Sequence, residues 1–171
     1  MKKVAVFGKP GSGKSTVSKV LAQMSGLPLH QLDSIVYKPN GEFVAREEFD
    51  SVHDDILQSE SWVIDGLGPL RSFNERLAAA DTLVYIDIPY SVSYWFVTKR
   101  FLKGLFVKPE GWPDGSSVLK GTLNSYKMLK LSPKFWNDEF TSKLMEYASN
   151  KEVYIIKTVS ELNEFVSKQA K

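Results

Sequence analysis

The sequence predicts an α/β domain in which helices flank a parallel β-sheet. Short apolar runs, typical of strands buried on both faces of a sheet, alternate with segments whose apolar residues recur at helical spacing. Because parallel strands need long crossovers between them, this alternation indicates a parallel sheet with right-handed helical connections. The length of 171 residues fits a single domain over residues 1–171.

The strand candidates are short and apolar. They are Val4–Phe7, Leu29–Leu32, Trp62–Ile64, Thr82–Ile88 and Val153–Ile156. The first is an uninterrupted apolar run before a glycine-rich stretch, which is typical of a central strand. The fourth is the strongest, because it is rich in β-branched residues and is stopped by Pro89.

Helices are predicted between these strands. Apolar residues recur at helical spacing from Val17 to Met24, and Gly26 is a typical C-terminal stop. The later helices are expected at about Arg46–Gln58, Phe73–Ala80, Ser91–Leu105, Val118–Leu131, Pro133–Ser149 and Ser160–Lys168, the last with Ser160 as its N-cap. Two prolines and two glycines in Val107–Ser117 predict a loop that is longer than a simple connector.

Composition and charge exclude several classes of protein. The chain has no cysteine, which excludes disulfide scaffolds and cysteine-based metal centres, and its two histidines make a histidine-rich metal site improbable. A net charge of +2 is too small to drive nonspecific binding to nucleic acid or to a membrane surface. The longest stretch without Asp, Glu, Lys or Arg, Val20–Leu32, is shorter than the ~18 residues of a spanning helix. We expect a cytoplasmic protein, monomeric or homodimeric, with no membrane or nucleic-acid partner.

A phosphate-binding pattern follows the first strand. The segment GKPGSGKS at Gly8–Ser15 matches G-x-x-x-x-G-K-S/T and lies between a strand and a helix, as the pattern requires. Its backbone N–H groups and the helix N-terminus would attract phosphate, Lys14 would reach the β- and γ-phosphates, and Ser15 would hold Mg²⁺. The residues expected to bind the nucleotide are Gly8, Pro10, Gly11, Ser12, Gly13, Lys14, Ser15 and Thr16.

A signalling GTPase is disfavoured, although Asp65–Gly68 fits the pattern D-x-x-G. The guanine-reading N-K-x-D is missing, because Asn150–Val153 lacks the Asp and precedes a strand. A chain of 171 residues also leaves little room for the apparatus of a motor or a helicase.

Together with the phosphate loop, several segments resemble nucleoside-monophosphate-kinase-like proteins, in particular the adenylate-kinase-related DNA topology modulation proteins of bacteria. The segments are Leu29–Asp33, Arg46–Asp50, Trp62–Gly66, Glu75–Leu77, Ala80–Thr82 and Ile86–Pro89. The resemblance implies a three-layer P-loop NTPase fold with a five-stranded parallel sheet, and ATP as donor with Mg²⁺. It further implies an acceptor-binding insert at about residues 33–60 and a lid at about residues 101–130. The family name implies a link to DNA supercoiling, for which the charge distribution offers no physical basis.

Two acidic residues follow strands at the edge where α/β sheets bind ligands. In similar kinases, an Asp at the position of Asp33 orients the acceptor or takes its hydroxyl proton; a helix cap or turn is the alternative. Asp65 resembles an Asp that lies near Mg²⁺, so Ser15 and Asp65 are the metal candidates.

The four arginines are informative, because a guanidinium group binds phosphate oxygens in pairs. By resemblance, Arg100 enters the lid and clamps the transferring phosphate. A structural ion pair with Glu75 or Asp81 is the alternative for Arg76. The acceptor-binding candidates are Asp33, Arg46, Arg71 and Arg76, and the catalytic candidates are Lys14, Asp33, Asp65 and Arg100.

We therefore expect a Mg²⁺–ATP-dependent phosphotransferase of nucleoside-monophosphate-kinase type, which works by positioning and charge neutralisation. Two alternatives stay open. One is a nucleotide-binding regulatory protein linked to DNA topology, with weak or no kinase activity. The other is a kinase for a small metabolite that is not a nucleotide.

Overall fold

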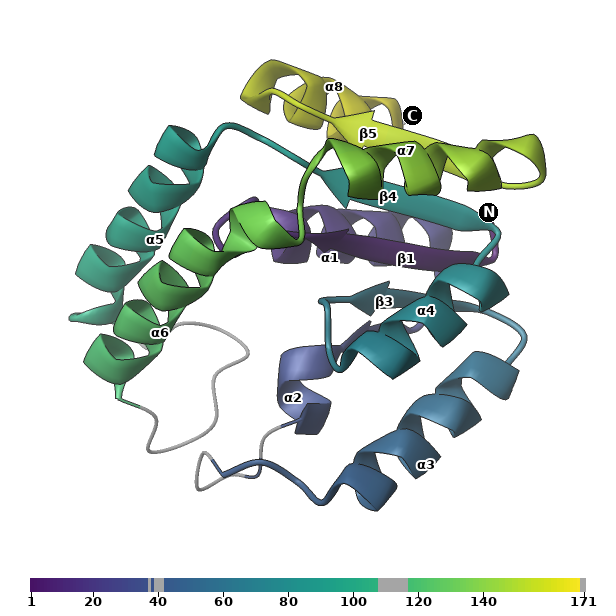
Figure 1. Ribbon diagram of the computed structural model, residues 1–171, viewed down its shortest axis with the longest axis horizontal. Helices are drawn as coiled ribbons and strands as arrows, with labels where there is room; N and C mark the ends of the chain where they lie inside the picture. Colours follow the sequence, from purple (N-terminus) through teal and green to yellow (C-terminus); the bar gives the residue numbers. More distant parts are fainter. Residues whose placement is uncertain (37, 39–41, 108–116, 170–171) are drawn as a thin grey trace.

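The sheet has five parallel strands, as expected. The computed structural model describes residues 1–36, 38, 42–107 and 117–169, so the predicted loop Val107–Ser117 lies outside the described residues except for its two ends. The strands are β1 (Lys3–Gly8), β2 (Leu29–Gln31), β3 (Trp62–Asp65), β4 (Thr82–Ile86) and β5 (Glu152–Ile156). Their order in the sheet is β2-β3-β1-β4-β5 (Figure 1).

The helices alternate with the strands along the chain. They are α1 (Lys14–Ser25), α2 (Leu32–Val36), α3 (Arg46–Gln58), α4 (Leu70–Ala79), α5 (Tyr90–Gly104), α6 (Val118–Leu131), α7 (Asp138–Glu146) and α8 (Val159–Gln169), with short 3₁₀ turns η1 (Ser132–Lys134) and η2 (Tyr147–Ser149). None of the helices described is long and apolar enough to cross a membrane.

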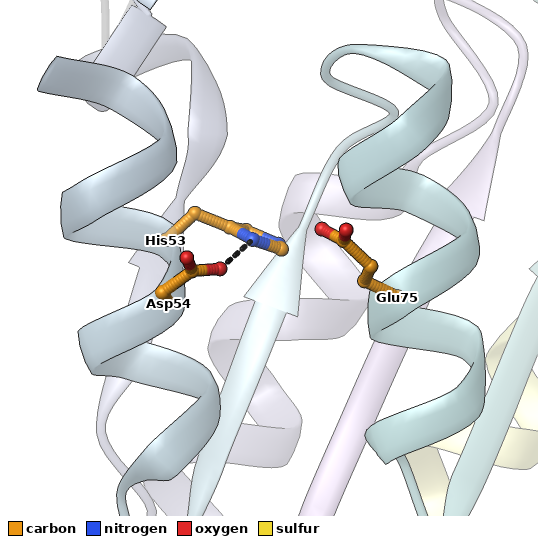
Figure 2. Close-up of side chains that lie close together, drawn as sticks. All are labelled: His53, Asp54 and Glu75. Carbon is orange, nitrogen blue, oxygen red and sulfur yellow. Dashed lines mark ion pairs between the residues drawn. The ribbon is translucent and has the colours of Figure 1, made fainter. Parts of the chain in front are cut away.

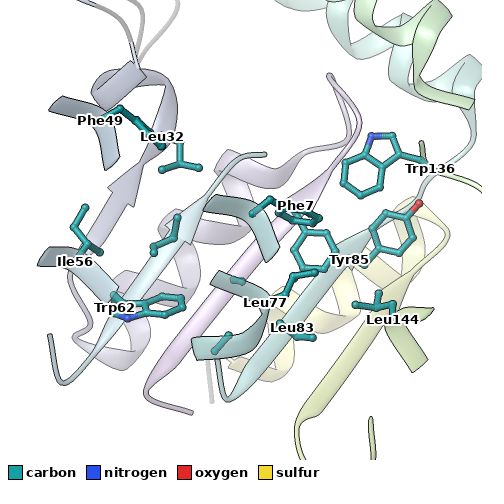
Figure 3. Close-up of a cluster of buried hydrophobic side chains, with 14 residues drawn as sticks. Phe7, Leu32, Phe49, Ile56, Trp62, Leu77, Leu83, Tyr85, Trp136 and Leu144 are labelled. Carbon is teal, nitrogen blue, oxygen red and sulfur yellow. The ribbon is translucent and has the colours of Figure 1, made fainter. Parts of the chain in front are cut away.

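The sheet is covered on both faces, which makes three layers. Successive side chains of a strand point to opposite faces. Val4 and Val6 accordingly belong to one apolar cluster, with side chains of α1 and α8, whereas Phe7 belongs to another, with side chains of α3, α4 and α7. The second cluster is rich in aromatic rings (Figure 3), and the ring of Tyr85 stacks on that of Trp136 with centroids 5.3 Å apart. The three-layer α/β fold is therefore confirmed.

The last two predicted helices differ from the structure in their N-terminal ends. Instead of one helix over Pro133–Ser149, a 3₁₀ turn precedes α7, because the Asn137 side chain accepts a hydrogen bond from the backbone N–H of Phe140 and so caps a new helix. The cap predicted at Ser160 is also wrong. Helix α8 begins one residue earlier, and Thr158 Oγ1 accepts the hydrogen bond from Glu161 N.

The carboxyl ends of the strands meet at one edge of the sheet. Pairing aligns Gln31 of β2 with Asp65 of β3, Asp65 with Val6 of β1, and Gly8 of β1 with Ile86 of β4. In Figure 1 this edge points toward the side on which α5 and α6 lie next to each other. Residues that follow these strands therefore converge where open α/β sheets bind ligands.

Candidate active site

The phosphate loop connects the end of β1, at Gly8, with the start of α1, at Lys14. Gly11 has a φ of 68°, and a Cβ atom there would lie 2.5 Å from the carbonyl oxygen of Ser93 and 2.8 Å from Val97 Cγ2. Only glycine fits this approach of the loop to α5. The loop leads into the N-terminus of a 12-residue helix, whose positive dipole end favours an anion.

The predicted nucleotide-binding residues occupy this loop and the first turn of α1. Lys14 is half-buried, and its Nζ donates a hydrogen bond to the carbonyl oxygen of Lys9 at 3.1 Å. Burial lowers the pKa of Lys14, while the negative charges of Asp65 and Asp33 act against this shift. A lysine that donates to a loop carbonyl can turn to a phosphate oxygen in its place. The other members of the set are Gly8, Pro10, Gly11, Ser12, Gly13, Ser15 and Thr16.

Asp65 and Ser15 provide oxygen atoms suited to Mg²⁺. Asp65 is 5% exposed, and its Oδ1 has no hydrogen-bond partner among the residues that the structure describes. Burial raises the pKa of Asp65, while the charge of Lys14 and the hydroxyl of Ser15 oppose the increase. Ser15 itself is exposed. A buried carboxylate oxygen without a partner, next to an exposed hydroxyl, fits a hard cation such as Mg²⁺.

Asp33 and Arg100 complete a charged group around Lys14. Asp33 is exposed in the first turn of α2, because β2 ends at Gln31 rather than at Leu32. Burial lowers the pKa of both Lys14 and Arg100, and the negative charge of Asp33 opposes this shift in each. The structure therefore brings all the predicted catalytic residues into one electrostatic group, contributed by α1, α2, β3 and α5.

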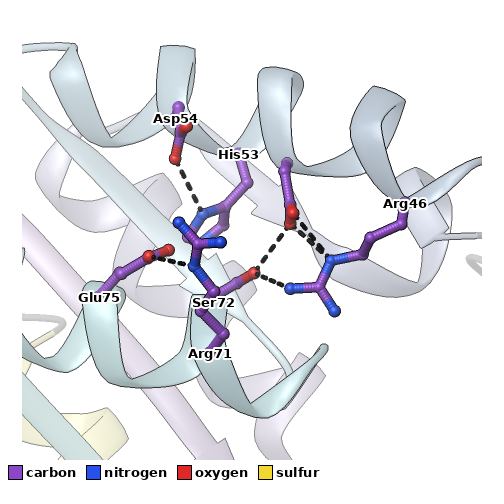
Figure 4. Close-up of polar contacts among 7 residues, drawn as sticks. Arg46, His53, Asp54, Arg71, Ser72 and Glu75 are labelled. Carbon is purple, nitrogen blue, oxygen red and sulfur yellow. Dashed lines mark hydrogen bonds and ion pairs between the residues drawn. The ribbon is translucent and has the colours of Figure 1, made fainter.

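The arginines at positions 46 and 71 interact with carboxylates of their own helices. Figure 4 shows both at the contact of α3 with α4. Arg46 Nε lies 2.9 Å from each carboxylate oxygen of Asp50, and Arg71 Nε donates to Glu75 Oε1 at 3.0 Å. The structure therefore places these two predicted acceptor-binding side chains in i,i+4 ion pairs.

Arg76 is fully buried below the loop that follows β3. Its Nη2 donates hydrogen bonds to the carbonyl oxygens of Gly66, at 2.9 Å, and Leu67, at 2.7 Å. Burial lowers the pKa of Arg76 to about 10, against the negative charge of Asp65. Arg76 thus holds this loop by donating hydrogen bonds to backbone carbonyl oxygens. This contact is structural, but it differs from the ion pair with Glu75 or Asp81 that was the alternative from the sequence.

Lys9 and Asp87 form an ion pair that the sequence analysis did not predict. Lys9, in the variable part of the phosphate-loop pattern, is 1% exposed, and its Nζ donates to Asp87 Oδ1 at 2.5 Å. The same ammonium group lies 4.5 Å from the centroid of the Tyr90 ring. Because Asp87 directly follows β4, this pair fixes the loop against the neighbouring strand. The sequence did contain a signal for this pair, because Asp87 is an acidic residue at the end of a predicted strand of the same sheet.

Sequence comparisons give partial matches. No family model matches the chain. It is 34% identical over 73 residues to the shikimate kinase of Dehalococcoides mccartyi, covering 36% of this chain and 42% of that protein. It is 30% identical over 99 residues to the shikimate kinase of Mycobacterium tuberculosis, covering 50% of this chain and 56% of that protein. The chain spans about half the length of these curated relatives.

Solved structures match almost the whole chain. The shikimate kinase of Acinetobacter baumannii in complex with shikimate has a TM-score of 0.59 at 16% identity, covering 98% of this chain and 90% of that one. A gluconokinase of Sinorhizobium meliloti has a TM-score of 0.52 at 16% identity, covering 98% of this chain and 89% of that one. The chain therefore shares the three-layer α/β fold of these two kinases. These likenesses do not confirm the adenylate-kinase-related DNA topology modulation subfamily.

Proposed function

We propose that this chain is a Mg²⁺–ATP-dependent kinase that phosphorylates a hydroxyl group of a small metabolite. The observation that carries the proposal is the position of Asp33. Its exposed carboxylate shares one electrostatic group with Lys14 and Arg100, next to the phosphate loop. A carboxylate in this place can receive the proton of an acceptor hydroxyl while cationic groups hold the phosphates.

In the proposed reaction, the acceptor oxygen forms a bond to the γ-phosphorus of ATP as the bond to the β,γ-bridging oxygen breaks. The hydroxyl proton passes to the carboxylate of Asp33, and ADP leaves. The phosphate loop and Lys14 would bind the phosphate oxygens, and Arg100 would stabilise the charge that is transferred. Ser15 and Asp65 would hold Mg²⁺, which neutralises phosphate charge when bound.

The contacts that Arg46, Arg71 and Arg76 already make favour an acceptor without a phosphate group. Arg46 and Arg71 are paired with carboxylates, and Arg76 is buried against backbone carbonyls. An acceptor such as a nucleoside monophosphate would have to displace these contacts to obtain bidentate binding. A hydroxylated metabolite needs only Asp33 and a complementary pocket. The partial sequence matches to proteins named shikimate kinase support the same class of acceptor.

A screen of acceptors with coupled detection of ADP tests the proposal. The panel contains hydroxylated acids, including shikimate and gluconate, sugars and the nucleoside monophosphates. We expect ADP formation that depends on a hydroxylated acceptor and that Asp33→Asn removes. ADP formation with a nucleoside monophosphate would instead reassign the acceptor, and ADP at the same rate without any acceptor would indicate an ATPase.

A further inference from the structure

A second group of ligand-type side chains lies between α3 and α4, on elements that do not carry the phosphate loop. His53 and Asp54 belong to α3 and Glu75 to α4, and one potential ligand atom from each lies within 4.8 Å of the other two. Figure 2 shows the imidazole of His53 reaching from α3 toward Glu75, with Asp54 beside it. The distance from His53 Nδ1 to Asp54 Oδ1 is 3.9 Å.

The imidazole of His53 is buried without a hydrogen-bond partner. Its side chain is 0% exposed, and neither ring nitrogen has a partner in the part of the chain that the structure describes. The ring stacks on Phe49, with centroids 5.7 Å apart and an interplanar angle of 18°. A buried polar group with no partner is costly and calls for an explanation. Here the ring packs against Phe49, and its two nitrogens have no hydrogen-bond partner among the described residues.

Charged side chains of both signs lie around His53. Burial lowers the pKa of His53, and the positive charge of Arg76 lowers it further. Asp54, Glu75 and Asp50 act in the opposite direction. Glu75 and Asp50 are themselves paired with Arg71 and Arg46, so Asp54 and an exchangeable Glu75 are the carboxylates that could turn to a bound cation.

We propose that His53, Asp54 and Glu75 bind a divalent transition-metal ion, with Zn²⁺ as the expected occupant. One imidazole nitrogen and two carboxylate oxygens are ligands that Zn²⁺ accepts, whereas Mg²⁺ and Ca²⁺ prefer oxygen ligands alone. A fourth position would be taken by water. Two histidines in the chain made a histidine-rich site improbable, but a site of this kind requires only one.

Binding requires the two carboxylates to close in around the fixed ring. Zinc bonds of ~2.0–2.2 Å in a tetrahedral site put neighbouring ligand atoms ~3.4 Å apart. The side chains of Asp54 and Glu75 are 59% and 39% exposed, so both have room to move. Glu75 would exchange its exposed ion pair with Arg71 for the metal, and such pairs contribute little to stability. The bound ion would then join α3 to α4.

The test uses the full, untagged chain without nucleotide, so its result is independent of the proposed kinase activity. Zn²⁺ is titrated in competition with a chromophoric chelator, and Co²⁺ is titrated as a spectroscopic substitute. We expect one equivalent of metal with visible absorption from bound Co²⁺. His53→Phe and Glu75→Gln should each weaken Zn²⁺ binding by more than about 10-fold. Loss of a residue that only hydrogen-bonds to a metal ligand already costs about 10-fold or more.

Glu139→Gln is the matched control, because Glu139 is also an exposed carboxylate in an i,i+4 pair with a basic residue, Lys143. It should bind Zn²⁺ like the wild type, and Zn²⁺ should raise the melting temperature of both. Equal affinity in the wild type and in the His53 and Glu75 variants, or no bound equivalent at all, would overturn the proposal. If His53→Phe does not fold, the variants Glu75→Gln and Asp54→Asn decide the question, because Asp54 is exposed and Glu75 is partly exposed.

Discussion

The phosphate-loop side and the acceptor side of the candidate active site are built in different ways. The loop is one contiguous segment, Gly8–Ser15, whose conformation depends on glycine and on backbone approach to α5. The proposed acceptor side depends on side chains from separate elements, with Asp33 on α2 next to Arg100 on α5, which would stabilise the transferred charge. Each of those side chains acquires its role from neighbours that are distant in sequence. A local sequence pattern is therefore enough to specify the phosphate loop. The acceptor side can be specified only once the fold brings the separate elements together.

The largest effect is expected from Asp33→Asn, which tests the acceptor side alone. If Asp33 receives the acceptor proton, turnover should fall by about 10²–10⁴-fold while the affinity for Mg²⁺–ATP is retained. Steady-state kinetics and calorimetric titration measure the two quantities. Asp138→Asn is the matched control, because Asp138 is likewise exposed in the first turn of a helix. Turnover near that of the wild type would assign Asp33 to the local structure of α2.

Lys14→Ala tests the phosphate-loop side. It would remove the proposed charged contact to phosphate from a loop whose other expected phosphate contacts are backbone N–H groups, so we expect the fold to remain and most of the affinity for Mg²⁺–ATP to be lost. Any residual activity should fall by about 10²–10³-fold, as for the loss of one transition-state donor. Lys19→Ala on the same helix should bind nucleotide normally. Unchanged affinity in a folded Lys14→Ala protein would move the nucleotide site away from the loop.

Arg76→Met asks whether the buried arginine supports the loop after β3 or binds the acceptor. The variant leaves the carbonyl oxygens of Gly66 and Leu67 without these charged donors but also removes a buried charge, so we expect a net loss of about 1–3 kcal/mol in the free energy of unfolding, measured by urea denaturation. Arg71→Met, on the exposed side of the same helix, should leave stability nearly unchanged. Normal stability of Arg76→Met combined with a raised KM for the acceptor would favour a binding role instead.

A smaller, pH-dependent effect is expected from Asp65→Asn. Because burial raises the pKa of Asp65 in the folded state, the protonated carboxyl favours folding, and this contribution is lost as pH rises through that pKa. At pH 7 the ionised carboxylate therefore lowers stability. The variant without nucleotide should be more stable than the wild type at pH 7, with a difference that shrinks toward pH 4. Urea denaturation at both pH values measures it, and a constant difference would contradict the assigned cause.

The sequence alone allowed the elements that depend on local pattern to be predicted well. The bounds of α3 were predicted as Arg46–Gln58, and the strands were found because buried parallel strands are short apolar runs. The grouping of Asp33 and Asp65 near Lys14 could also be predicted, because the carboxyl ends of parallel strands meet at one edge of the sheet. Tertiary partners could not be read in this way. The carbonyl oxygens bound by Arg76 and the Lys9–Asp87 ion pair depend on which segments the fold places together.

Phosphorus NMR of a reaction with Mg²⁺–ATP and the acceptor found in the screen tests the central claim most directly. The account predicts that the γ-phosphate appears as a phosphate ester of the acceptor in the same amount as ADP, and that neither forms with Asp33→Asn. Inorganic phosphate in place of the ester, or no ADP above the Lys14→Ala background with any acceptor, would contradict the assignment of this site as a kinase centre.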